Sequence, residues 1–332
     1  MTTPLVSVIV PLFNCEPYVQ EALDSVLQQE IDDLEIVAVD DGSTDATLDI
    51  VRAFGPRVRL LRQRNLGPAA ARNCAVRASR GRYLAFIDAD DLWRPGKLQA
   101  QLEYLEAGGD CPIVFTQFAY WRPDASGRYL APDAVVEAAR SWLDPAPWTG
   151  WLYPQILLRT PIHIITTLIR REVYDSVGGF DEALRGGSDY DFWIKATRRY
   201  RAHRVPGCYA LYRLHGAGIT TVPKPINYGY LILMRALQNQ GRCGPDGRCV
   251  EETALQARLA ELCFRFGRLH YLKGDARLAR AAFLRAYRHD VRQLRALAYA
   301  GLASVRSALG TRVADALYRS AKALSSRSNS NA

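Results

Sequence analysis

The chain has 332 residues, of which 48% are hydrophobic and 23% charged, the composition of an ordinary folded protein. Its formal charge of +9 is unevenly spread, because positions 1–240 hold 26 basic and 27 acidic residues whereas positions 241–332 hold 17 and 7. The near-neutral N-terminal part argues against a nucleic-acid-binding protein, since such a domain carries its basic excess on the binding surface.

The first residues, MTTPLVSVIVPLF, lack the basic start of a signal peptide, and no run of about 18 apolar residues is present. We therefore predict a cytoplasmic protein. The seven cysteines include no CxxC pair, which favours reduced thiols over a disulfide framework or a zinc site. Cys243 and Cys249 flank a Gly-Pro-Asp-Gly turn, and a bridge or weak chelation between them is the alternative.

Apolar, β-branched runs alternate with helical stretches from residue 5 to residue 118. This alternation is typical of an α/β protein with a mostly parallel sheet and helices on both faces, whose functional groups follow the carboxyl ends of the strands. The predicted strands cover 5–10, 34–39, 58–61, 82–87 and 112–118, and the predicted helices lie near 17–29, 45–54, 68–79 and 95–107.

Residues 119–162 contain four of the six tryptophans with many prolines and glycines, which favours a long loop with short helices and a role in specificity. Order returns in 163–218, with a helix near 189–200 followed by a strand. From about residue 226 the chain is predicted to be helical.

In the C-terminal part, apolar residues recur every three or four positions, and Gly274 and Asp275 are suited to end one helix and cap the next. The repeated residues are Leu255, Leu259, Leu262, Phe266 and Leu269. Gly267, Gly274, Ala279, Phe283 and Ala286 have the spacing of one tetratricopeptide-like helix pair. We predict a helical segment over 226–324 and a disordered tail over 325–332.

Two acidic clusters follow predicted strands: DDGSTD begins at Asp40 and DADD begins at Asp88. Clustered carboxylates raise one another's pKa unless a cation neutralises them, and Mg²⁺ or Mn²⁺ binds oxygen ligands together with phosphates. On an extended segment Asp88 and Asp90 point to the same side, while Asp91 begins the next turn. Asp-rich turns that only cap helices are the alternative.

Five motifs occur in a fixed order: VSVIVPLFNCEPYVQEALDSVLQQ, VAVDDGSTDATLDIV, NLGPAAARNCAVRASRGRYLAFIDADDLWRPGKL, VGGFDEALRGGSDYDFWIKA and YRLHGAGIT. Together they resemble the family 2 glycosyltransferases of the GT-A fold, over roughly residues 4–220. The resemblance implies a catalytic domain over 1–225 that inverts the anomeric carbon of a nucleotide-diphosphate sugar. It does not extend to the last hundred residues.

The resemblance also implies roles for the donor-binding residues. Pro11 and Phe13 provide the surface on which the nucleobase stacks. Asp41, with Asp40, accepts a hydrogen bond from a uracil-type N3–H, which favours a UDP- or dTDP-sugar. The nucleotide-sugar site is completed by Arg72 of the ARN motif, for which a helix-surface arginine is the alternative, and by Asp88 and Asp90.

For catalysis, the resemblance implies that Asp90 and His215 bind Mn²⁺ or Mg²⁺ and that the aspartate of an ED motif is the base. Here Ser188 replaces the usual glutamate, so Asp189 is the predicted base and Asp191, which points some 200° away on a helix, is the second choice. The alternative is that both aspartates only stabilise a helix N-terminus. No QxxRW signature of processive enzymes is present, which favours transfer of a single sugar.

We expect a saccharide or lipid-linked saccharide acceptor in surface polysaccharide biosynthesis. The arginines of 285–322 are compatible with an anionic membrane surface, hence a peripheral location on the inner face of the membrane, and equally with a solvated helical face. The sequence favours two other functions less. A nucleotidyltransferase lacks support because PLFN stands where its glycine-rich loop is expected. The other alternative is a catalytically degenerate transferase that acts as a binding module through its helical tail. The intact aspartates argue against it, but the replacement of the usual glutamate by Ser188 leaves this alternative open.

Overall fold

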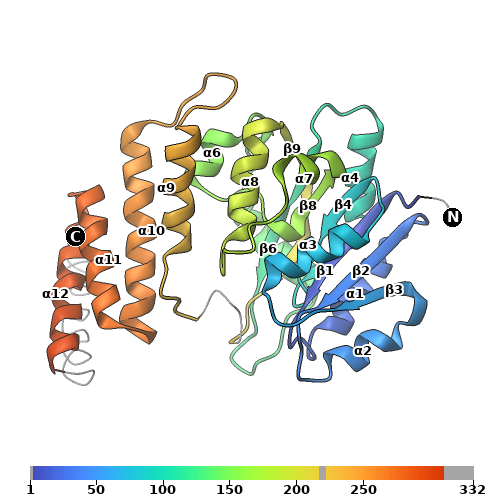
Figure 1. Cartoon of the computed structure of the whole chain (residues 1–332), viewed down its shortest axis with the longest axis horizontal. Helices are drawn as coiled ribbons and strands as arrows, with labels where there is room; N and C mark the ends of the chain where they lie inside the picture. The colour runs from blue at the N-terminus through green and yellow to red at the C-terminus, as the bar shows by residue number, and fades with distance from the viewer. Residues whose placement is uncertain (1–2, 217–221, 310–332) are drawn as a thin grey trace. The chain divides into compact units, whose positions relative to one another are not determined.

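The computed structural model describes residues 3–216 and 222–309 (Figure 1). The chain forms two compact units. The first comprises Met1–His215 together with Gln240–Cys249, and the second comprises Gly216–Asn239 and Val250–Ala332. The segment Gln240–Cys249 therefore belongs to the first unit, although it lies within the predicted helical part of the sequence.

The first half of the first unit has the predicted alternation of strands and helices. It contains β1 (Val6–Leu12), α1 (Val19–Leu27), β2 (Leu34–Asp40), α2 (Thr47–Ala53), a 3-10 turn (Gly55–Arg57), β3 (Val58–Arg62), α3 (Pro68–Ala78) and β4 (Tyr83–Phe86). The four strands are parallel, in the order β3-β2-β1-β4. β1 and β4 are buried almost throughout, as expected for a parallel sheet that is covered on both faces. The parallel α/β prediction is confirmed for these strands.

The second half of the unit extends this sheet with strands of both directions. It contains β5 (Leu92–Trp93), α4 (Lys97–Glu106), β6 (Ile113–Trp121), α5 (Pro132–Ala139), a 3-10 turn η2 (Arg140–Trp142), β7 (Thr149–Gly150), α6 (Tyr153–Leu158), a 3-10 turn η3 (Ile164–Thr166), β8 (Thr167–Arg170), α7 (Arg171–Val177), α8 (Ser188–Arg199) and β9 (Ala202–Arg213). The strand order continues β4-β8-β6-β9-β5, with β7 paired to β9. β8 is antiparallel to both of its neighbours, so the complete sheet is mixed.

The segment 119–162 contains the predicted short helices, α5 and α6, but it also includes the end of β6 and the short strand β7. β6 continues through Trp121, whose indole nitrogen donates to the backbone oxygen of Leu130 at 2.9 Å. Trp121 and Val135 lie in one buried apolar cluster, which explains why α5 packs against β6. The helices α5 and α6 each have a proline in the first turn, Pro132 and Pro154. A proline is tolerated there because the amide hydrogens of the first turn have no partner within the helix.

The second unit consists of helices in its described part: α9 (Tyr228–Gln240, whose last residue belongs to the first unit), α10 (Glu252–Lys273), α11 (Ala276–His289) and α12 (Leu294–Leu309). α10 ends before Gly274, and the Asp275 carboxylate accepts from the amides of Arg277 and Leu278. Both capping predictions are therefore confirmed. The predicted apolar face of α10 is only partly right, since Leu255 and Leu259 are buried but Leu262, Phe266 and Leu269 are half-exposed. The buried stripe instead continues through Cys263, Phe264, Gly267 and Tyr271.

Gly267 of α10 lies against Phe283 and Ala279 of α11. A Cβ atom at this position would be 2.9 Å from the Phe283 ring and 3.2 Å from the backbone oxygen of Ala279. We expect Gly267→Val to lower the free energy of unfolding by about 1–3 kcal/mol, because the buried contact cannot accommodate the added atoms. Urea unfolding of the full chain measures the change. Gly301→Ala on α12 is the control, since none of the described residues lies within 4 Å of the added methyl, and it should be neutral or slightly stabilising.

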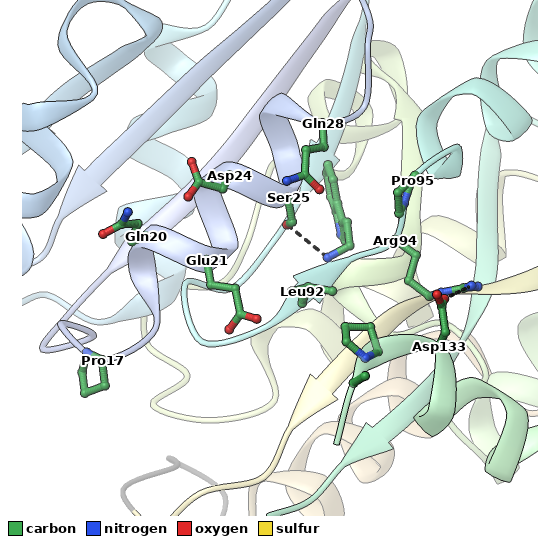
Figure 2. A pocket seen from close by; sticks show the side chains of 13 residues that line it. Pro17, Gln20, Glu21, Asp24, Ser25, Gln28, Leu92, Arg94, Pro95 and Asp133 are labelled. Carbon is green, nitrogen blue, oxygen red and sulfur yellow. Dashed lines mark hydrogen bonds and ion pairs between the residues drawn. The ribbon is translucent and has the colours of Figure 1, made fainter. Parts of the chain in front are cut away.

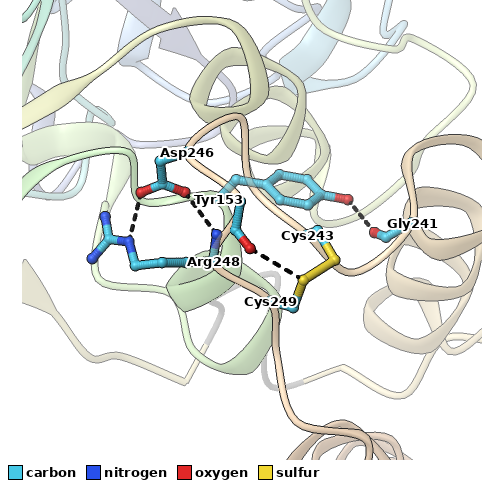
Figure 3. The surroundings of a disulfide bond; sticks show 7 residues. Tyr153, Gly241, Cys243, Asp246, Arg248 and Cys249 are labelled. Carbon is cyan, nitrogen blue, oxygen red and sulfur yellow. Dashed lines mark hydrogen bonds and ion pairs between the residues drawn. A yellow bond between two sulfur atoms is a disulfide. The ribbon is translucent and has the colours of Figure 1, made fainter.

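The prediction that the cysteines are reduced is wrong for one pair. Cys243 and Cys249 form a disulfide that closes a hairpin in which the Gly244 amide donates to the Arg248 backbone oxygen (Figure 3). The Tyr153 hydroxyl donates to the Gly241 backbone oxygen at 2.7 Å, and an Arg248 guanidinium nitrogen donates to the Trp151 backbone oxygen at 3.2 Å. The bridged hairpin is thereby attached to the start of α6. The other five cysteines are free thiols.

Removal of this bridge should have a modest effect on stability. We expect Cys243→Ser/Cys249→Ser to lower the free energy of unfolding by about 2 kcal/mol without reductant, because the bridge closes only a short loop in the unfolded chain. In dithiothreitol, the wild type and the variant should unfold alike. A thiol titration of the unfolded, unreduced protein provides the second readout: five thiols are expected, and seven would show that the bridge does not form in solution.

Candidate active site

The loops after β1 and β2 are joined by reciprocal hydrogen bonds. The Asn14 amide donates to the Ser43 hydroxyl at 3.0 Å, and the Asn14 side chain accepts from the Thr44 amide at 2.8 Å. Asn14 has a φ of 47°, a conformation that asparagine tolerates better than most residues. Phe13, immediately before it, is 47% exposed, and Pro11 is half-buried. The fixed loop thus holds an exposed aromatic ring at the carboxyl edge of the parallel strands.

The two aspartates after β2 both interact with the protein itself. The Asp41 carboxylate accepts from the amides of Leu66 and Gly67 at 2.8 and 2.7 Å and from the Gln63 side chain at 2.7 Å. It therefore holds the loop that precedes α3. Asp40 is completely buried, accepts from the Ser43 amide at 3.1 Å and lies 3.6 Å from the Arg62 guanidinium. These contacts give Asp40 a structural task in the turn at Gly42.

The DADD segment is a tight turn, so the premise of an extended segment is wrong. The Asp91 amide donates to the Asp88 backbone oxygen at 3.0 Å, and residues 89 and 90 form the turn. Asp91 does not begin a new turn but closes this one. Its carboxylate is buried and accepts from the Arg213 amide of β9 at 2.8 Å. Burial, followed by the neighbouring charges of Asp90 and Asp88, raises the pKa of Asp91 well above its usual range.

Asp88 and Asp90 have different partners. The buried guanidinium of Arg72 on α3 donates to the Asp88 carboxylate, while His215 Nε2 lies 2.8 Å from Asp90 Oδ2. The side chains of Asp88 and Asp90 remain 25% and 35% exposed. The structure therefore brings Arg72 and His215, which are far apart in the sequence, to the two ends of one turn.

Asp189 and Asp191 differ in their surroundings. α8 begins at Ser188, which is buried, and Asp189 lies half-buried in its first turn. Asp191 is 4% exposed, and its carboxylate lies 2.6 Å from Lys195 Nζ one turn later. The Asp191 carboxylate is therefore held within α8 by its own ion pair.

The charges of this edge interact through Arg72. Burial alone would lower the pKa of Arg72, but Asp88, then Asp189, then Asp90 raise it above its usual value. These three carboxylates come from two separate motifs. One buried guanidinium therefore balances part of the negative charge of the whole cluster, and the helix-surface alternative for Arg72 is wrong.

His163 belongs to the same cluster, and sequence reasoning missed it. It immediately precedes η3. Burial lowers the pKa of His163, and the positive charge of Arg72 lowers it further. The negative charges of Asp189, Asp88 and Asp90 partly offset this lowering. Its Nδ1 atom is buried without a hydrogen-bond partner among the described residues. A single histidine in RTPIHIITT carries no motif, so only the fold reveals this position.

Asp90 and His215 also fit a divalent cation. They present one carboxylate oxygen and one imidazole nitrogen 2.8 Å apart, a donor pair that suits Mn²⁺ and leaves the other coordination positions to water and phosphate oxygens. Within residues 3–216 and 222–309, no group of three or more histidine, cysteine or acidic side chains converges as a metal site. The two-residue donor set is therefore the one that the described chain offers here.

A hollow of about 630 Å³ lies beside this edge, between α1, β5 and α5 (Figure 2). Glu21 and Asp24 of α1 line it, and Arg94 pairs with Asp133 at its rim. None of the site residues predicted from the sequence lines this hollow. Glu21 connects the hollow to the carboxylates through Arg213. The Arg213 guanidinium donates to the Glu21 carboxylate, and its Nε donates to the Asp90 backbone oxygen at 2.7 Å.

The fold and the carboxylate cluster define an α/β protein with an acidic site at the carboxyl ends of its parallel strands, and comparison with known proteins shows its family. The family model for glycosyl transferase family 2 matches residues 7–155. The putative teichuronic acid biosynthesis glycosyltransferase TuaG of Bacillus subtilis is 31% identical over 223 residues, which cover 66% of this chain and 82% of TuaG. The chain belongs to the family 2 glycosyltransferases.

Solved structures show the same GT-A fold. S. aureus TarS 1-349 in complex with UDP-GlcNAc matches with a TM-score of 0.61 and 20% identity, over 95% of this chain and 92% of that one. The mannosyltransferase PcManGT of Pyrobaculum calidifontis, in complex with GDP-Man and Mn²⁺, matches with a TM-score of 0.52 and 22% identity, over 98% and 81%. The chain spans only 30–59% of the length of five rickettsial glycosyltransferases that it matches at 28–33% identity. Among the described residues, no helix combines the length and apolar character needed to cross a bilayer.

Proposed function

We propose that this protein is an inverting, metal-dependent glycosyltransferase that moves a single sugar from a UDP- or dTDP-sugar to a saccharide or lipid-linked saccharide in surface polysaccharide biosynthesis. The observation that carries the proposal is the convergence of Asp88, Asp90 and Asp189 around Arg72 at the carboxyl edge of the sheet. TarS with UDP-GlcNAc and TuaG, as named, support the donor and pathway classes.

The donor is held at the β1, β2 and β4 edge. The exposed Phe13 ring is placed to stack on the nucleobase, and Pro11 forms the strand end beneath it. Asp41 contributes by fixing the Leu66–Gly67 backbone, and one of its oxygens has a single donor, which leaves acceptor capacity for a base N–H. Asp88, with Arg72 behind it, faces the ribose.

Asp90 and His215 would hold Mn²⁺ or Mg²⁺, and such a cation would supply positive charge that offsets the charge of the departing diphosphate. Asp189 takes the proton of the acceptor hydroxyl, whose oxygen then bonds to the anomeric carbon while the bond to the diphosphate breaks. Arg72 keeps the carboxylates in place and limits their mutual repulsion. Ser188, buried at the start of α8, leaves the position of the usual glutamate without a charge.

Release of nucleoside diphosphate from UDP-, dTDP- and GDP-sugars with Mn²⁺, with water as the acceptor, tests this proposal. Turnover of one donor that stops in EDTA is the expected result. Turnover that is unchanged in EDTA would contradict the metal-dependent part. If only GDP-sugars are hydrolysed, the predicted preference for a uracil- or thymine-containing donor is wrong.

We also propose that the C-terminal helices bind an anionic membrane surface, which would place the enzyme near a lipid-linked acceptor. Exposed Val291, Leu294 and Leu297 surround the start of α12, next to exposed Arg288 and Arg292. The remaining part of 285–322, from residue 310 onward, and the predicted tail 325–332 lie outside the described residues. Sedimentation with phosphatidylglycerol vesicles tests the idea, and binding that survives Leu294→Ser/Leu297→Ser would oppose it.

A further inference from the structure

Four aromatic rings form a continuous cluster next to the carboxylates of the first unit. Phe118 and Tyr120 come from β6, Tyr212 from β9, and His163 from the residue before η3. The His163 ring lies 4.8 Å from both Phe118 and Tyr212, and Tyr120 lies 5.3 Å from Phe118 and 5.9 Å from Tyr212, all measured between ring centroids. These separations are those of interacting aromatic pairs.

The strands are irregular where they present these rings. β6 and β9 are parallel, and their register shifts between Phe115 and Gln117 and again between Gln117 and Phe118. Beyond the shifts, Tyr120 and Tyr212 are paired residues on neighbouring strands. Bulges next to active sites commonly re-aim side chains, and here the irregularity directly precedes the aromatic residues.

The cluster is open on one side. Tyr120 is 55% exposed, while Phe118, Tyr212 and His163 are half-buried. Arg122, itself exposed, lies 5.9 Å over the Tyr120 ring and places donors at the rim. Grouped aromatic rings that stay open to solvent mark a binding surface more often than a folding requirement. Flat rings with donors at the rim suit a ligand that has an apolar face and hydroxyl edges.

His163 connects this cluster to the reacting groups. Among the charges that act on His163, Asp189 is the strongest, followed by Asp88. Burial lowers the pKa of His163 and so favours the neutral imidazole, in which one ring nitrogen carries a proton and the other accepts. Nδ1 is buried without a partner, and an unpaired buried N–H is rarer than an unpaired acceptor, which assigns the proton to Nε2.

We propose that Phe118, Tyr120, Tyr212 and His163 form the subsite that holds the acceptor, and that the acceptor is a saccharide whose pyranose ring lies against the tyrosines. His163 Nε2–H donates to the reacting hydroxyl oxygen and orients that hydroxyl so that its proton points to Asp189. The proposal rests on the proposed function, because it assigns the acceptor side of the same reaction.

Saturation-transfer NMR with the methyl glycosides of glucose, galactose, N-acetylglucosamine and rhamnose, in the presence of UDP and Mn²⁺, tests the subsite. We expect at least one glycoside to bind the wild type and Tyr120→Ala to weaken its binding about tenfold. Tyr120→Phe should retain binding, since it keeps the ring. Trp142→Ala is the matched control, because Trp142 is an 86% exposed aromatic outside the cluster.

His163 is tested by transfer to the glycoside that binds. His163→Ala should raise the acceptor KM and slow transfer, and His163→Gln, which keeps an N–H donor, should recover part of both. UDP affinity should be unchanged in every variant. Glycoside binding that is insensitive to Tyr120→Ala, a loss shared by Trp142→Ala, or no glycoside binding by protein that binds UDP would overturn the subsite. Failure of the wild type to bind any nucleotide would instead count against the proposed function.

Discussion

Asp189→Asn is expected to slow release of nucleoside diphosphate from the active donor about 10²–10⁴-fold, the range that a positioned general base contributes. Asparagine has nearly the same shape and still suits the first turn of α8, so the fold should be unaffected. Nucleotide affinity should stay within about twofold, since the proposed role of Asp189 lies on the acceptor side. Turnover is measured at saturating donor and Mn²⁺, with circular dichroism as the test of folding.

Asp191→Asn is the matched control two residues away. The Asp191 carboxylate pairs with Lys195, so its loss should lower stability more than it lowers turnover. If Asp189→Asn is fully active while Asp191→Asn is folded but inactive, Asp191 rather than Asp189 is the base. Full activity of both variants would place the base elsewhere.

Asp90→Asn is expected to lower turnover by about 10²–10³-fold at ordinary Mn²⁺ concentrations, which is the scale of losing one element of transition-state charge stabilisation. The physical reason is that the amide oxygen is a weaker cation ligand than the carboxylate and leaves His215 without its partner. The diagnostic readout is the Mn²⁺ concentration that gives half-maximal turnover, which should rise in the variant.

Asp133→Asn controls for the removal of one negative charge, because the Asp133 side chain is 88% exposed and pairs with Arg94 rather than with a residue of the carboxylate turn. It should leave the Mn²⁺ dependence unchanged. If Asp90→Asn and wild type respond identically to Mn²⁺, the cation is not held by Asp90.

Much of this architecture could be predicted because it depends on local patterns. Runs of apolar residues predict the strands β1, β2 and β4, and the structure confirms them. Gly274 and Asp275 likewise predict the short connection between two helices. The motif order placed Asp88, Asp90 and Asp189 in one family-typical arrangement. The structure then brought all three within the electrostatic reach of Arg72.

Other features depend on contacts between distant segments and could not be read from the sequence. The DADD segment turns rather than extends because Asp91 is fixed by the Arg213 amide of β9. Asp41 is surrounded by donors from the Leu66–Gly67 loop, which no local pattern announces. His163 packs against Phe118 and Tyr212, which come from two strands far from it in the sequence.

The disulfide was misjudged for a different reason. An odd number of cysteines without CxxC is a property of the whole chain, whereas the Cys243–Cys249 bridge depends on one tight hairpin. The Gly-Pro-Asp-Gly turn between the two cysteines is the local signal, and it indicates the bridge better than the composition of the whole chain does. Local geometry decides the pairing of neighbouring cysteines.

Calorimetric titration of the wild-type protein with UDP, dTDP and GDP, each with Mn²⁺ and with EDTA, tests the central claim most directly. The expected result is binding of UDP or dTDP that requires Mn²⁺ and is lost in Asp90→Asn. Absence of binding by any of the three nucleotides to folded protein would contradict a donor site at the carboxylate edge, and would favour a degenerate transferase that acts as a binding module.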